Sequence, residues 1–186
     1  RLANIGSRGE HPNNCHRDLD KCLVPTQLEK AITEHTIPLK SKMGVCWKQQ
    51  SMLRPHEAFA ALYSGHRDAF NTRILGPTGK LQSFWAAMTE DQDHPVRARP
   101  GDQDQAIPLA VHGDGVPITG VGKSWSKSGE TFSWSSLLGS GSTLDTNYYM
   151  YCVFKPMISH IPGSKTMDAV WKILAWSFFW LWRGRW

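Results

Sequence analysis

Apolar residues recur at helical spacing between residues 55 and 88 and again near the C-terminus. Phe59, Leu62 and Tyr63 share one face of a helix that has Pro55 at its favoured first position. Leu81, Phe84 and Trp85 form a second such face, which ends before a polar stretch. By this pattern, helices are predicted over residues 55–63, 80–88 and 167–182, with a short helical turn at 67–73.

Strand-like patterns follow in the middle and later parts of the chain. Apolar or alternating runs predict three strands, at residues 107–119, 131–138 and 147–154. The first run contains Asp114 between two glycines, which is typical of a strand that presents a carboxylate at its carboxyl end. Two short edge strands are expected earlier, at 36–39 and 43–47, because Pro38 cannot donate to a central strand.

These elements predict an α+β protein whose C-terminal part is α/β-like. A loop-rich, helical N-terminal region is expected over residues 1–90 and a polar linker over 91–106. Residues 107–186 are then a strand-strand-strand-helix unit, a three-stranded sheet with a packing helix. The chain begins without Met and stops inside an aromatic run, so we expect it to be the N-terminal segment of a longer protein, incomplete at its C-terminus.

The C-terminal helix is unusually aromatic. Five of the nine tryptophans lie in the last sixteen residues, and Thr166 is the expected helix cap. The longest charge-free run, residues 173–182, is half of the roughly 20 residues that a membrane span needs. Burial against the sheet is the favoured interpretation, and an interfacial helix with its tryptophans among lipid headgroups is the alternative.

The net charge of +5 and a pI near 9.1 favour an anionic partner. DNA is the predicted partner, and a membrane surface is not expected. No small-molecule cofactor is predicted. Four cysteines are spread too widely for a disulfide scaffold, which favours a reducing, intracellular compartment.

Two short segments partly match ligand-binding motifs. Cys15, His16 and Cys22 invite a zinc site, but six residues separate the cysteines where structural zinc sites use two to four, so a loop with incidental thiols is favoured. Residues 122–124, Gly-Lys-Ser, match the end of a phosphate-binding loop. The first glycine of that motif is replaced by Pro117 and no helix pattern follows, so a nucleotide site is not predicted.

Asp114 is the leading candidate for chemistry. Three strands followed by a helix form the start of a ribonuclease H-like fold, in which the first catalytic carboxylate lies on the first strand. Two Mg²⁺ or Mn²⁺ ions held between carboxylates activate a nucleophile against a phosphodiester. We therefore predict Asp114 as a catalytic metal ligand, with its partner carboxylates beyond Trp186. His112, Lys123 and Lys127 are predicted to contact nucleic acid; the alternative for Asp114 is a turn residue.

Several short motifs resemble an uncharacterised, highly repeated protein family of protist genomes. They are Asn14-Cys15-His16-Arg17-Asp18-Leu19, Pro55-His56-Glu57, Phe84-Trp85, His112-Gly113-Asp114-Gly115-Val116-Pro117, Ser133-Trp134-Ser135-Ser136-Leu137-Leu138 and Thr166-Met167-Asp168. The high copy number of that family implies mobile-element ancestry. The strand–Asp–strand layout is similar, more weakly, to the start of Kyakuja-Dileera-Zisupton transposases. The resemblance implies a transposase-like, metal-dependent DNA-processing protein that acts in the nucleus and is inactive as this segment alone.

A second hypothesis belongs to another class of function. The aromatic C-terminal helix is expected, in this hypothesis, to dock on a partner protein or a membrane surface, and the chain is then a non-catalytic binding or assembly module. Salt-sensitive DNA binding favours the first hypothesis, whereas liposome binding that depends on the helix favours the second.

Overall fold

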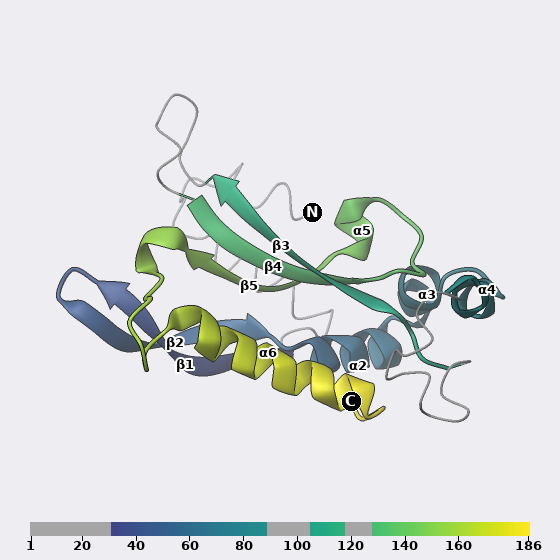
Figure 1. Ribbon diagram of the computed structural model, residues 1–186. Helices are drawn as coiled ribbons and strands as arrows, with labels where there is room; N and C mark the ends of the chain where they lie inside the picture. Colours follow the sequence, from purple (N-terminus) through teal and green to yellow (C-terminus); the bar gives the residue numbers. More distant parts are fainter. Residues whose placement is uncertain (1–30, 89–104, 118–127) are drawn as a thin grey trace, which may run out of the picture.

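The computed structural model describes residues 31–88, 105–117 and 128–186, which form an α+β fold. The longer elements, in chain order, are β1 (Ile32–Ser41), β2 (Gly44–Leu53), α2 (Pro55–Gly65), α4 (Lys80–Ala87), β3 (Leu109–Pro117), β4 (Ser128–Ser136), β5 (Tyr148–Phe154) and α6 (Thr166–Trp182). The shorter elements are α3 (Arg67–Phe70), the π-helical η5 (Asn71–Leu75), α5 (Thr143–Thr146) and the 3₁₀ turn η7 (Lys155–Met157). Figure 1 shows α6 lying along one face of the three-stranded sheet. The β1–β2 hairpin extends past one end of α6.

The predicted helices are confirmed with small shifts at their ends. Helix α2 has Pro55 at its start, and it buries Phe59 and Leu62. Helix α4 begins at the expected residue, Lys80. The short helical turn is longer than expected, because α3 continues without interruption into η5 and ends at Gly76.

The β1–β2 hairpin is much longer than the two short edge strands expected from the sequence. Its strands pair antiparallel from Ile32 opposite Leu53 to Ser41 opposite Gly44. Lys42 and Met43 form the two-residue turn. The prediction that the second strand begins at Met43 is therefore wrong by one residue. Gly44 follows with a φ of 114°, a conformation that costs glycine little. Among the described strands β1 pairs with β2 alone, so Pro38 lies in an edge strand of this hairpin.

The three strands predicted later in the chain form one antiparallel sheet in the order β3-β4-β5. Side chains of β4 alternate, and Phe132, Trp134 and Ser136 are buried on one face. A register shift between Phe132 and Ser133 marks a bulge in the pairing with β5. The predicted loop between the first two strands, residues 118–127, lies outside the described residues, as do Lys123 and Lys127.

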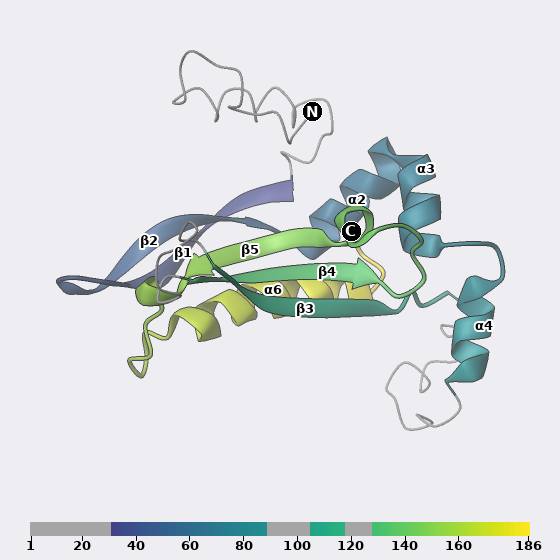
Figure 2. The same cartoon turned by 90° about the horizontal axis from the view of Figure 1, so that it is seen from above.

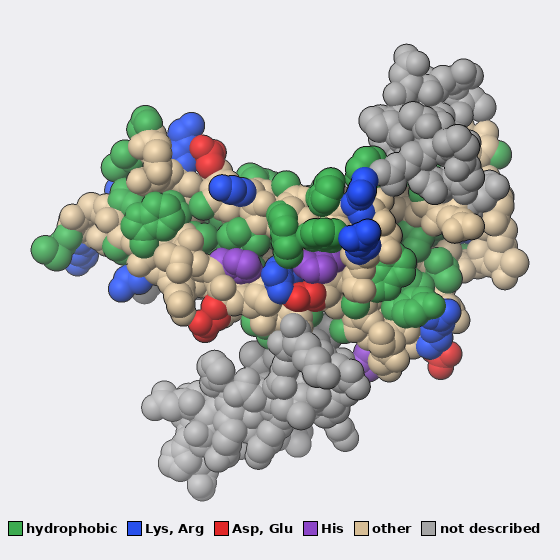
Figure 3. All heavy atoms as spheres, turned by 90° about the horizontal axis from the view of Figure 1, so that it is seen from below, with side chains coloured by type: hydrophobic (Ala, Val, Ile, Leu, Met, Phe, Trp, Pro, Cys, Tyr) green, Lys and Arg blue, Asp and Glu red, His purple; other side chains and the backbone are tan. Residues whose placement is uncertain are grey.

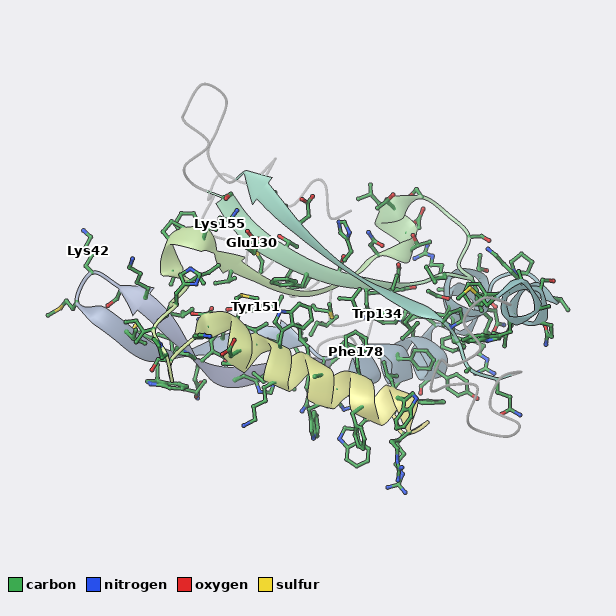
Figure 4. The ribbon with its side chains drawn as sticks, viewed as in Figure 1. Lys42, Glu130, Trp134, Tyr151, Lys155 and Phe178 are labelled. Atoms are coloured by element: carbon green, nitrogen blue, oxygen red, sulfur yellow. The ribbon has the colours of Figure 1, made fainter. Side chains whose placement is uncertain are left out.

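The hydrophobic core lies between this sheet, α6, α2 and the hairpin. It is one continuous cluster that draws residues from both sides of the predicted linker, including Phe59, Trp134, Tyr151 and Leu174. Figure 4 shows Trp134, Tyr151 and Phe178 in the space between the sheet and α6. Burial raises the pKa of Tyr151 to about 12, so its phenol stays protonated at neutral pH. Most of the predicted linker, residues 89–104, lies outside the described residues.

Two glycines let the η5 segment approach the end of β4 closely. A Cβ on Gly76 would lie 2.1 Å from the carbonyl oxygen of Leu138, and one on Gly139 would lie 2.2 Å from that of Arg73. The hydroxyl of Ser136 donates to the carbonyl of Ile74 at 2.6 Å across the same contact. This contact therefore fixes the helical segment to the sheet through backbone groups that only glycine leaves accessible.

The prediction that Thr166 caps α6 is wrong. Lys165 occupies the cap position, and no side chain caps the helix there. The Thr166 hydroxyl is buried instead; it donates to the carbonyl of Pro38 at 2.5 Å and accepts from the backbone N–H of Ser159 at 2.8 Å. The tertiary contact with β1 thus uses the side chain that the local pattern assigned to capping.

Candidate functional site

Asp114 lies in the interior of β3 and not at its carboxyl end. It pairs with Thr131 on β4, and three more residues of the strand follow it. Neither flanking glycine makes a turn, so both the expectation of a sharp turn and the alternative role as a turn residue are wrong. Gly113 serves packing, because a Cβ there would lie 3.2 Å from the ring of Phe132.

Asp114 and His112 share one exposed face of β3, but the acidic residue on the neighbouring strand lies on the other face. The Asp114 side chain is exposed, and His112 lies two residues away on the same face of the strand, also exposed. The acidic residue on the neighbouring strand, Glu130, pairs with Gly115, so it lies on the opposite face. It forms an ion pair with Lys155 at 2.8 Å, and Figure 4 shows the two side chains together.

A metal centre is not assembled within the part of the chain that the structure describes. No group of three His, Cys, Asp or Glu side chains there is arranged to hold a metal ion. Asp114 therefore stays a predicted metal ligand for Mg²⁺ or Mn²⁺. The candidate zinc ligands Cys15, His16 and Cys22 lie outside the described residues.

The tip of the β1–β2 hairpin forms a basic, apolar surface that sequence reasoning missed. We call it the hairpin end and define it by Lys40, Lys42, Met43, Trp47 and Ile161. Met43 is 99% exposed, Trp47 is 58% exposed and Ile161 is 57% exposed, which is high for apolar side chains of this size. Figure 3 shows hydrophobic side chains beside Lys and Arg side chains at this end of the molecule, at the left.

A shallow pocket opens between the hairpin end and the segment that follows η7. It has a volume of about 590 Å³. Its walls are contributed by two parts of the chain, Lys40, Ser41, Lys42, Gly44 and Val45 on one side and Ile158, Ser159, His160, Ile161 and Pro162 on the other. The lining thus combines the apolar residues Val45, Ile158 and Ile161 with Lys40 and Lys42.

The register of the hairpin brings the charged and aromatic groups of this surface together. Trp47 pairs with Pro38 and Val45 pairs with Lys40, so Trp47 and Lys40 are diagonal neighbours on one face. Neither Lys40 nor Lys42 forms an ion pair within the described ranges, whereas Lys155 pairs with Glu130 and Lys165 with Asp168. The sequence shows no sign of this surface because Lys40 and Lys42 are two isolated charges on either side of Ser41, and only the pairing register shows that Lys40 shares a face with Trp47.

A second polar cluster connects the start of α2 to α6. The Ser177 hydroxyl lies 2.8 Å from Nδ1 of His56 and accepts from the backbone N–H of the same residue at 3.1 Å. The guanidinium of Arg54 forms an ion pair with Glu57 and lies over the ring of Trp176, 5.4 Å from its centre. His56 is thus partly buried and hydrogen-bonded.

This cluster is built for packing. Ser177 is fully buried, so its hydroxyl cannot meet a substrate as a nucleophile. Burial lowers the pKa of His56, with the positive charge of Arg54 acting in the same direction and Glu57 opposing it. A neutral His56 with Nδ1 accepting from Ser177 leaves the proton on Nε2, an arrangement that ties two helices together.

Helix α6 is buried on one side, as the favoured interpretation predicted, and the interfacial alternative stays a prediction. One face is buried against α2 and β1, and the opposite face exposes a row of aromatic rings. Trp176, Phe179 and Trp182 are each 46–47% exposed. Within the described ranges, no helix is long and apolar enough to cross a membrane.

Comparisons with known proteins identify no family for this chain. The chain matches no protein-family model, and searches among curated proteins and solved structures likewise found no match.

Proposed function

We propose that this protein binds DNA through the hairpin end, as the DNA-binding part of a transposase-like protein. The observation that carries the proposal is that Lys40, a diagonal neighbour of Trp47, and Lys42, in the turn of the same hairpin, have no acidic partner in the described ranges. Free amino groups neutralise phosphates, and this electrostatic term supplies most of the affinity of non-specific binding.

Trp47 adds a second element of recognition. Its ring is more than half exposed and has Lys40 as a diagonal neighbour. Bases of single-stranded DNA stack on such rings, worth about 1–3 kcal/mol per base, while adjacent amino groups follow the backbone. The hairpin projects beyond α6, so a strand of DNA can reach the ring without displacing the core (Figure 1). We therefore expect stronger binding to single-stranded than to double-stranded DNA.

Asp114 keeps its predicted role within this proposal. A carboxylate exposed on β3 is accessible to a metal ion, and further acidic residues outside the described ranges would have to complete a two-metal centre. Lys123 and Lys127, which lie outside the described residues, remain predicted phosphate contacts. The transposase-like assignment places the protein in the nucleus and requires Mg²⁺ or Mn²⁺ for any cleavage.

The experiment compares two double variants that remove the same charge. Fluorescence anisotropy with a labelled oligonucleotide is measured over a range of salt concentrations for Lys40→Ala/Lys42→Ala and for Lys155→Ala/Lys165→Ala. We expect the first to weaken binding and to lower the salt slope by about 1 per lysine. The second removes lysines that already have carboxylate partners and should change the slope little. Equal losses in the two variants would show that binding depends on net charge and would contradict the proposal.

Trp47→Ala and Trp47→Phe separate stacking from charge. The alanine variant is expected to lose affinity for single-stranded DNA by a factor of about 5–100, since one stacked base is worth about 1–3 kcal/mol. The phenylalanine variant retains a ring and should recover most of the loss. An alanine variant that binds like the parent would leave Trp47 outside the interface.

A second candidate function rests on the exposed row of α6. Trp176, Phe179 and Trp182 lie along that row, and basic Lys172, Arg183 and Arg185 are exposed on the same helix and its end. Aromatic rings with flanking basic groups fit the headgroup region of an anionic membrane. Co-flotation with phosphatidylserine vesicles, lost in Trp176→Ala/Phe179→Ala and absent with neutral vesicles, would support it. Failure of the parent protein to float with either vesicle would exclude it.

A further inference from the structure

Strand β3 has an open edge. It pairs with β4 on one side, and no other strand pairs with it within the part of the chain that the structure describes. All six residues from Val111 to Val116 are exposed. Figure 2 shows β3 at the outer margin of the sheet, whereas β5 at the other margin lies next to β2.

Of the features that usually prevent edge strands from pairing with one another, this strand carries one charged residue, Asp114, and Pro117 at its end. Natural edge strands carry lysines, bulges or short lengths that discourage pairing. Strand β3 has nine residues without a lysine, and its register with β4 is regular throughout. Val111 and Val116 are 46% and 43% exposed, so the edge also offers apolar side chains. Its backbone groups are available for a further strand.

The sequence of β3 is complementary to itself when read in the opposite direction. In an antiparallel pair centred on Gly113, His112 lies opposite Asp114, and Ala110 lies opposite Val116. Each imidazole then meets a carboxylate on the same face, twice in the pair, because directly opposed residues share a face of the sheet. Val111 lies opposite Gly115 on the other face.

Neighbouring two-fold registers lack this match. Centring the pair on Asp114 places the two carboxylates directly opposite each other, which is destabilising. Centring it on His112 places the two imidazoles together and leaves each Asp114 opposite Ala110. Charge complementarity thus selects one register, and that register has the two-fold symmetry of most homodimers.

We propose that two copies of this chain pair through their β3 edges, antiparallel and centred on Gly113, to form a continuous six-stranded sheet. The interface is isologous, with His112 of each copy contacting Asp114 of the other. This proposal does not depend on DNA binding by the hairpin end, which contributes nothing to the interface. It engages Asp114 and His112 between the two copies, so in the dimer these residues are not available for the metal and nucleic-acid roles predicted for them.

The test measures the solution mass of the full chain by light scattering after gel filtration. We expect a dimer with twice the 21.0 kDa mass of the chain. His112→Asp places carboxylates opposite carboxylates at both contacts and should give a monomer that still unfolds cooperatively, at a melting temperature that no longer depends on protein concentration. The swapped variant His112→Asp/Asp114→His has the composition of the parent and recreates both pairs, so it should restore the dimer.

Cysteine pairs report the register independently of charge. Ala110→Cys/Val116→Cys places two cysteines opposite each other at each end of the proposed pair and should form a covalent dimer on mild oxidation. Ala110→Cys alone, which faces Val116, should not. A parent chain that is monomeric at all concentrations, or a dimer that withstands His112→Asp and fails to cross-link in Ala110→Cys/Val116→Cys, would overturn the proposal.

Discussion

The two faces of α6 differ in a way that the apolar content of the helix does not suggest. The buried face carries Thr166, Val170, Leu174 and Ser177, and none of these is aromatic. The exposed face carries most of the large rings, among them Trp176 and Phe179. Small and medium side chains allow α6 to approach α2 and β1 closely, and two hydroxyl groups on that face make tertiary hydrogen bonds. The packing contacts and most of the exposed rings therefore lie on opposite sides of one helix.

Leu174→Ala tests this comparison with the largest expected effect. Leu174 is fully buried in the core cluster, and removing it should lower the free energy of unfolding by about 2–5 kcal/mol, the range found for truncations that leave a cavity. Phe179→Ala removes a larger side chain from the exposed face and should cost less than about 1 kcal/mol. Urea denaturation of both variants gives the comparison. Similar losses would show that the exposed rings also hold the helix in place.

Thr166→Val should have an intermediate effect. The substitution keeps the shape but removes the hydroxyl that joins the N–H of Ser159 to the carbonyl of Pro38. Both backbone groups would lose that buried partner, which costs about 1–3 kcal/mol. Thr36→Val, on an exposed position of β1, is the matched control. A thermal melt in which both variants unfold at the same temperature would contradict the role given to the hydroxyl.

The smallest effect is expected from pH. Burial lowers the pKa of His56 below its usual 6.5, so the unfolded chain binds the proton more readily than the folded one. The stability contributed by neutral His56 is therefore complete above pH 6.5 and is lost as the pH falls through the lowered value. Burial also lowers the pKa of His35, which adds in the same direction.

Denaturation curves measured from pH 7.5 down to about pH 5 should show this decline. In His56→Gln the decline should be shallower, since one of the two groups has been removed, while the exposed control His160→Gln should retain it. A steeper decline in His56→Gln would contradict the assignment.

Much of the fold was predictable because local patterns determine it. Pro55 and the apolar spacing after it located α2, and alternation located β4 and β5. The hairpin was underestimated because the exposed polar residues of β2, such as Gln49 and Gln50, carry little periodic signal. The sequence predicted Asp114 at the end of a strand because glycines on both sides usually indicate a turn. In the structure, Gly113 instead leaves room for a ring on the next strand.

The sequence by itself determined the elements, their order and the basic, tryptophan-rich character of the chain, because propensity and periodicity act over a few residues. Only the tertiary structure decided which face of α6 is buried, since a helix that is apolar on nearly all sides has no pattern to orient it. It also decided that Lys40 lies beside Trp47 and that Asp114 faces away from Glu130. These outcomes depend on strand register, which is set by pairing between distant residues and is invisible in any one segment.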